Sequence, residues 1–152
     1  MSVCCNKFMN AALLQAKKAT LTGDVPVGAV IVKDDVIIAK GRNKREKDNS
    51  SIAHAEIDAI SKACKKLGTW RLHDCEMYIT LEPCPMCAGA IINSRLKAVH
   101  IGTPDPKGGA VFSKLDIFSC GFNHTPLVTI GTMQGECSKI LSDFFAGLRK
   151  KT

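Results

Sequence analysis

The chain has 152 residues and a mass of 16.4 kDa, a length that fits one domain with its own hydrophobic core. Hydrophobic residues make up 45% and charged residues 23% of the sequence, which excludes disordered and low-complexity classes. No hydrophobic run is longer than four residues, far short of the ~18 that a membrane span requires. We therefore expect residues 1–152 to form a single soluble domain with no membrane partner.

The charge and the cysteines both bear on location and partners. Lys and Arg outnumber Asp and Glu by 21 to 14, which raises the odds of a polyanionic partner such as nucleic acid, although charge alone fits a merely soluble basic surface equally well. Three lysines and three amide side chains interrupt the first twenty residues, so a secretory signal is not expected. The eight cysteines are therefore expected to be reduced thiols in a cytoplasmic protein.

The first part of the chain predicts a helix followed by a hairpin. Apolar residues recur at helical spacing over Asn6–Leu21. Val27–Val32 and Val36–Lys40 are β-branched runs separated by a short polar turn, which predicts two antiparallel strands. A polar loop over Asn43–Ser51 then leads to a second amphipathic helix, Ala53–Leu67.

The second part alternates strands and helices. Three further strands are predicted, and proline tolerates the first turn of the helix that follows the first of them. A loop rich in proline and glycine, Thr103–Gly109, is of the kind that carries function. An opening hairpin followed by this alternation predicts an α/β fold with helices on both faces of a five-stranded sheet. In chain order these elements are the strand Cys75–Leu81, a helix from Pro83, the strands Lys97–Gly102 and Pro126–Thr132, and the helix Glu136–Lys150.

Two short segments place metal-binding residue types at predicted helix starts. His54 and Glu56 open the second helix, and Cys84 and Cys87 open the third. Each segment alone is weak evidence, because a lone histidine is often structural and a cysteine pair can be a redox pair or half of a structural site. Imidazole and thiolate are the ligands that zinc prefers, so together the segments predict a zinc site.

A structural zinc site needs a fourth protein ligand, and the sequence offers few. Cys64 lies roughly 15 Å along the helix from His54, and Cys75 opens the strand that leads to Cys84, near the opposite end of the sheet. Spacing does not exclude the remaining cysteines, Cys4, Cys5, Cys120 and Cys137. Three protein ligands and a water form the pattern of catalytic zinc.

Glu56 favours the catalytic interpretation. Residues two apart on a helix point away from each other, so His54 and Glu56 share a site only if the metal lies beyond the helix end. The carboxylate can then hydrogen-bond a zinc-activated water and move its protons. Cys84 and Cys87 are expected on one helix face, where free N–H groups favour thiolate. These residues predict hydrolysis of a polar substrate.

The motifs resemble those of the bacterial tRNA-specific adenosine deaminase family, a branch of the cytidine deaminase superfamily. His-x-Glu followed by Pro-Cys-x-x-Cys is the general signature of zinc-dependent nucleobase deaminases. The resemblance runs from about Asn6 to Lys150. It is carried by Pro26-Val27-Gly28-Ala29, Ala53-His54-Ala55-Glu56-Ile57, Trp70-Arg71-Leu72, the run from Thr80 to Ala90, Asp105-Pro106-Lys107-Gly108-Gly109, Asn123-His124 and Leu141-Ser142-Asp143-Phe144-Phe145.

The resemblance implies a fold, an activity and residue roles. The fold would be a three-layer α/β/α arrangement around a mixed five-stranded sheet, as in cytidine deaminases. The activity would be conversion of adenosine to inosine at the wobble position of a tRNA anticodon stem-loop, by a homodimer. Zinc held by His54, Cys84 and Cys87 would activate water, and Glu56 would transfer its proton. The substrate-binding residues would be Asn43, Ala55, Asp105, Lys107 and Phe144.

Two other functions remain open from the sequence. The first is deamination of a free base or nucleoside, such as guanine, cytosine or cytidine. The second is a non-catalytic zinc-containing module that binds RNA. A spare carboxylate beside a three-ligand site argues against the second, because a structural site gains nothing from it.

Overall fold

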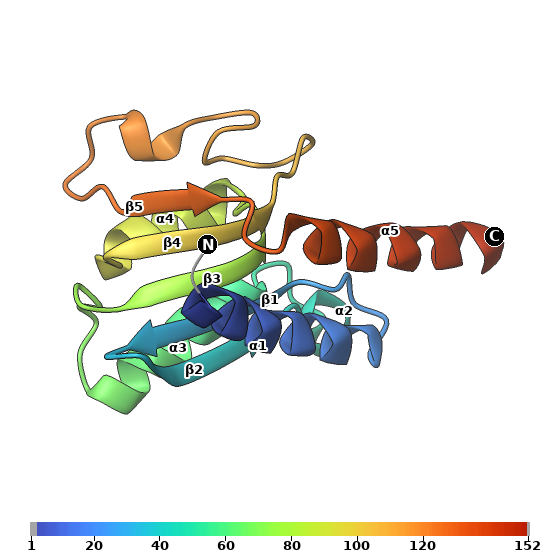
Figure 1. Cartoon of the computed structure of the whole chain (residues 1–152), viewed down its shortest axis with the longest axis horizontal. Helices are drawn as coiled ribbons and strands as arrows, with labels where there is room; N and C mark the ends of the chain where they lie inside the picture. Colours follow the sequence, from blue (N-terminus) through green and yellow to red (C-terminus); the bar gives the residue numbers. More distant parts are fainter. Residues whose placement is uncertain (1–2, 152) are drawn as a thin grey trace.

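The computed structural model describes residues 3–151, apart from the side chain of Cys4. Its centre is a five-stranded sheet in the order β2-β1-β3-β4-β5 (Figure 1). Strand β1 pairs antiparallel with both β2 and β3, whereas β3, β4 and β5 are parallel. The strands are β1 (Gly28–Lys33), β2 (Val36–Arg42), β3 (Glu76–Leu81), β4 (Ala98–Thr103) and β5 (Leu127–Ile130).

Helices cover both faces of this sheet (Figure 1). One face carries α1 and the first part of α5, whose remainder extends beyond the sheet; the other face carries α3 and α4. The predicted α/β/α architecture around a mixed sheet is confirmed. The helices are α1 (Val3–Thr20), α2 (Arg45–Asp48), α3 (Ala55–Leu67), α4 (Pro85–Ser94) and α5 (Gln134–Lys151), with one 3-10 turn, η1 (Ile117–Ser119).

Two apolar clusters hold the layers together. The larger lies between the sheet and α3 and α4, and includes fully buried Met77, Ile79 and Ile91. The smaller lies under α1 and includes Phe8 and Tyr78, whose ring centroids are 5.2 Å apart. No helix in the described range is long and apolar enough to cross a bilayer.

The first local prediction that proved wrong is the loop Asn43–Ser51, which contains the short helix α2. Its backbone is anchored by Asp24, a carboxylate only 1% exposed. Asp24 accepts hydrogen bonds from the N–H groups of Glu46 at 2.6 Å and Lys47 at 3.3 Å. A single turn of charged residues has no apolar periodicity, and its anchor lies far away in the sequence, so the pattern could not predict it.

The second wrong prediction is that Cys84 and Cys87 share one helix face. Cys84 has extended backbone angles, φ −74° and ψ 173°, and α4 begins only at Pro85. The cause is Pro85 itself, because the residue before a proline is pushed out of the helical region while proline suits the first helical position. Cys84 is therefore the residue that precedes the helix, and only Cys87 lies within it.

Close backbone packing fixes the start of α3 against the sheet. A Cβ atom at Gly41 in β2 would overlap the carbonyl oxygen of Ala55 and lie 2.6 Å from the amide nitrogen of Ala59. Only glycine allows this approach without moving the helix. The position of the first turn of α3, which follows His54, thus depends on Gly41.

We predict that Gly41→Ala lowers the free energy of unfolding by about 1–3 kcal/mol, because the added methyl group forces α3 away from β2. Urea denaturation of the purified variant measures this change. Gly147→Ala is the matched control: its Cβ would meet nothing within 4 Å, and it should leave stability unchanged or raise it by up to about 1 kcal/mol. Equal midpoints for wild type and Gly41→Ala would contradict the proposed packing.

Candidate active site

Strand direction brings the candidate site residues to one edge of the sheet. Because β1 is antiparallel to both of its neighbours, β2 and β3 run the same way, and β4 and β5 are parallel to β3. The carboxyl ends of these four strands therefore lie at a common edge. His54 stands just before α3, which follows β2, and Cys84 stands just before α4, which follows β3.

His54, Cys84 and Cys87 form a compact group of potential metal ligands. Nδ1 of His54 lies 3.7 Å from Sγ of Cys84 and 3.5 Å from Sγ of Cys87. All three ligand atoms lie within 4.8 Å of one another. Tetrahedral zinc, with Zn–N near 2.0–2.1 Å and Zn–S near 2.3 Å, places nitrogen and sulfur about 3.6 Å apart. The group fits a zinc site.

Other cysteines have different surroundings. Sγ of Cys64 faces the Trp70 carbonyl at 3.8 Å, and the buried Cys75 lies beside Asp74 at the start of β3. Among the side chains that the structure describes, the metal-binding group holds only the three residues above. Cys5, Cys120 and Cys137 lie outside this group, and the side chain of Cys4 is outside the described part of the chain.

The protonation of this group is strongly perturbed. The hydrogen bond from the Cys87 thiol lowers the pKa of Cys84 to about 4, with a further contribution from His54. The same bond, together with burial, raises the pKa of Cys87, while the contact with Cys84 raises the pKa of His54. The two thiol groups and the imidazole thus share protons through hydrogen bonds. A divalent cation bound to the same atoms would displace these protons.

Glu56 lies in the first turn of α3 and is 4% exposed. Burial raises the pKa of its carboxyl to about 7. A group with such a pKa can take up and release a proton near neutral pH. Glu56 therefore has the chemistry of a general acid or base next to the His54, Cys84 and Cys87 group.

A pocket of about 180 Å³ opens above these side chains. It brings together most of the residues predicted to bind substrate, namely Asn43, Ala55 and Asp105. The Asn43 side chain is fixed in place: its amide nitrogen donates to the Val25 carbonyl at 3.1 Å, and its oxygen accepts from the Arg45 N–H at 3.1 Å. The complete lining is Val25, Val27, Asn43, Arg45, His54, Ala55, Glu56, Leu81, Glu82, Cys84 and Asp105.

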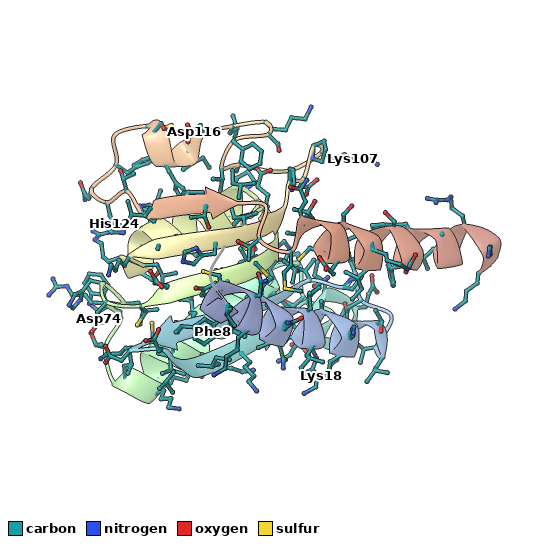
Figure 2. All side chains as sticks on the ribbon, in the orientation of Figure 1. Phe8, Lys18, Asp74, Lys107, Asp116 and His124 are labelled. Atoms are coloured by element: carbon teal, nitrogen blue, oxygen red, sulfur yellow. The ribbon has the colours of Figure 1, made fainter. Side chains whose placement is uncertain are left out.

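A wider groove of about 630 Å³ adjoins the pocket and shares Val25, Leu81 and Asp105 with it. Lys107 lines this groove from the loop above the start of α5 (Figure 2). The predicted Phe144 does not line it; the 42% exposed Phe145 does. The helical phase of α5 sets this difference, since Leu141, Ser142, Phe145 and Arg149 share the face that borders the groove.

Sequence reasoning missed a role for Glu82 in the pocket wall. Burial raises the pKa of its carboxyl, but hydrogen bonds from Ser113 and from backbone N–H groups lower it more, so the net pKa lies below its usual range. The sequence places Glu82 immediately before Pro83 and Cys84, and this position is the one feature that could have pointed to it. Nothing in the sequence pattern, however, shows which N–H groups reach it.

Comparison with known proteins identifies the family. Residues 5–149 match the MafB19-like deaminase family. The tRNA-specific adenosine deaminase of Bacillus subtilis (strain 168) is 49% identical over 145 residues, which cover 95% of this chain and 90% of that protein. The chain belongs to the tRNA-specific adenosine deaminase family.

The fold of this chain is also similar to those of solved deaminase structures. A structure from a study of A-to-I editing by tRNA:A34 deaminases at the wobble position of transfer RNA has a TM-score of 0.86 and 43% identity, covering 89% of this chain and 99% of that one. A guanine deaminase from Bacillus subtilis has 46% identity but a TM-score of 0.63, covering 68% of this chain and 66% of that one. The comparisons do not favour the free-base alternative.

We predict that the purified deaminase binds about one zinc ion per chain, and that Cys84→Ala lowers this content to well below half because only two ligands remain. Plasma mass spectrometry of the dialysed protein measures the ratio. The matched control is Cys64→Ala, which removes a cysteine outside the metal-binding group and should retain the metal. Full zinc content in Cys84→Ala would refute the assigned ligand set.

Proposed function

We propose that this enzyme hydrolytically deaminates adenosine to inosine at the wobble position of a tRNA anticodon. One observation carries the proposal: a buried carboxylate, Glu56, lies beside a zinc-compatible group, in a pocket that adjoins a larger, partly basic groove. The pocket suits a single base and the groove suits the nucleotides around it. The relative from Bacillus subtilis, 49% identical, is named tRNA-specific adenosine deaminase, and the 43% identical structure comes from a study of tRNA:A34 deaminases that act at the wobble position.

His54, Cys84 and Cys87 would hold the zinc ion, since their ligand atoms have the required spacing. Bound there, zinc supplies Lewis acidity, which lowers the pKa of a water molecule from 15.7 towards ~7. The protein's part would be to present one imidazole and two sulfur ligands beside the pocket, which His54 and Cys84 line.

Glu56 moves the protons of the reaction. Its carboxylate takes a proton from the attacking water and delivers it to the adenine ring, while the water oxygen bonds to C6. Glu56 then carries the remaining proton of the added hydroxyl group to the amino group, the C6–N bond breaks and ammonia leaves, so that adenosine and water give inosine and ammonia. The burial of Glu56 supports this role, because solvent does not compete for the transferred proton.

Asn43 and the backbone of Ala55 hold the base above Glu56. Asn43 is 7% exposed and its amide is oriented by hydrogen bonds to Val25 and Arg45, so its position is set before substrate arrives. Anticodon-loop bases are unpaired, so extruding one into a pocket costs less than opening a duplex.

The groove accommodates the neighbouring nucleotides. Asp105, Lys107 and Arg149 provide charged contacts, and Phe145 provides an exposed ring for stacking, in place of the predicted Phe144. The overall formal charge of +7 favours association with RNA phosphates. A free base alone would occupy the pocket and make no contact with this groove.

We also propose a homodimer and a cytoplasmic location. Exposed apolar side chains gather between residues 112 and 127, where Phe112, Leu115, Phe122 and Leu127 are all more than 40% exposed. Such concentrations often mark association surfaces. Among the described side chains, Cys64, Cys75, Cys84, Cys87, Cys120 and Cys137 form no disulfide, which suits a reducing compartment that also holds tRNA.

The decisive experiment incubates the zinc-loaded enzyme with an anticodon stem-loop bearing adenosine at the wobble position, alongside free guanine and cytidine. We expect inosine and ammonia from the stem-loop and no turnover of the free compounds. Glu56→Ala should keep the zinc and the fold but lose roughly 10²–10⁴-fold in kcat, because proton transfer is removed.

Glu136→Ala is the matched control, because it removes an exposed glutamate of α5 and should retain full activity. Turnover of guanine or cytidine without turnover of the stem-loop would replace the proposal with a free-base deaminase. Unchanged activity in Glu56→Ala would refute the proton-transfer role alone.

We predict that stem-loop binding weakens steeply with salt, because Lys and Arg side chains release counterions from the phosphates. Lys107→Ala should reduce the slope of log K against log salt by about 1, whereas Lys65→Ala, on α3 and outside the groove, should leave it unchanged. Fluorescence anisotropy with a labelled stem-loop at several salt concentrations measures the slope. A flat response in the wild type would contradict binding through phosphates.

A further inference from the structure

Glu82 is a buried carboxylate held by a single loop. It follows β3 directly and is only 2% exposed. Burying a carboxylate is costly unless it is paired or fully hydrogen-bonded. Within the described residues, no ion pair involves Glu82; instead its partners are the N–H groups of Asp105, Val111, Phe112 and Ser113, at 3.0–3.1 Å, and the hydroxyl of Ser113.

The loop over residues 104–113 is wrapped closely around this carboxylate. A Cβ atom at Gly109 would overlap the carboxyl group of Glu82, so a side chain there would force the loop and the carboxylate apart. Backbone bonds close the structure on both sides, from Glu82 N–H to the Thr103 carbonyl and from Ala110 N–H to the Pro83 carbonyl, each at 2.9 Å. The Glu82 side chain therefore joins the start of the loop, at Asp105, to its end, at residues 111–113.

This loop carries residues that the proposed function places next to the RNA. Asp105 lines both the pocket and the groove. Its side-chain oxygen accepts hydrogen bonds from the N–H groups of Lys107 at 3.1 Å and Gly108 at 3.2 Å, which forms the turn that presents Lys107 to the groove. Figure 2 shows Lys107 at the outer end of this loop.

We infer that Glu82 is a positioning residue for the RNA substrate: its carboxylate fixes the 104–113 loop so that Asp105 and Lys107 hold the nucleotides around the target base. The inference rests on the proposed function. Glu82 acts through the loop backbone and takes no part in the bond changes at C6. A glutamate that only stabilised the fold would affect stability without selectively affecting use of the RNA.

Two variants disturb this arrangement from opposite sides. Glu82→Gln removes the charge and exchanges one acceptor oxygen for an amino group, so the N–H groups lose partners. Gly109→Ala leaves the carboxylate intact but pushes the loop away from it, at a position distant in sequence from Cys84 and Cys87. Both should raise KM for the anticodon stem-loop by about tenfold or more while kcat changes less than about threefold and zinc content stays constant.

A double-mutant cycle separates positioning from general stabilisation. In the Asp105→Ala/Lys107→Ala background the loop contacts with RNA are already lost, so adding Gly109→Ala should raise KM by less than about threefold. Independent effects would instead multiply, as expected if Gly109→Ala acted on RNA binding by a route other than Asp105 and Lys107. Gly135→Ala, whose Cβ would meet nothing within 4 Å, is the matched control and should leave KM unchanged.

Each outcome decides between the two proposals. If wild-type enzyme fails to deaminate the stem-loop, the proposed function fails and the role of Glu82 fails with it. If wild type is active, an unchanged KM in Gly109→Ala, or multiplicative effects in the cycle, overturns the role of Glu82 alone. If only Glu82→Gln loses zinc, the KM of Gly109→Ala tests the role of Glu82. If both variants lose zinc, Glu82 supports the metal-binding group and the inference is overturned.

Discussion

The direction of the strands is the constraint on which the site depends. Four of the five strands, β2 to β5, run the same way, and only β1 runs against them. The segments that follow these four strands therefore meet at one edge of the sheet. They supply His54, Cys84, the 104–113 loop and the start of α5, which are separated by long stretches of sequence. Reversing any one of these strands would remove its contribution from the site.

Three buried carboxylates lie near this edge, and the hydrogen bonds that each one accepts determine what it can do. Glu56 has few compensating bonds, so burial raises its pKa to about 7, which suits proton transfer. Glu82 and Asp24 are equally buried but accept several backbone N–H bonds, from the 104–113 loop and from α2 respectively. The same type of side chain is thus suited to proton transfer at Glu56, whereas at Glu82 and Asp24 it anchors backbone segments.

Most elements and the metal-binding group could be predicted from the sequence, because hydrophobic periodicity and ligand spacing are local signals. The features that were missed depend on distant contacts or on helical phase. Helix α2 depends on Asp24, the orientation of α5 places Phe145 in the lining of the groove, and the partners of Glu82 lie across the sheet edge. Cys84 was misplaced for a local reason, since the effect of Pro85 on its neighbour can be read from the sequence.

The wall shared by the pocket and the groove has a consequence for altering this enzyme. Val25, Leu81 and Asp105 border both hollows, so under the proposed function a substitution there is expected to alter binding of the target base and of the neighbouring nucleotides together. Val27 and Asn43 border the pocket only, while Lys107 and Arg149 border the groove only. Engineering that aims to retune one property independently of the other should begin at these unshared positions.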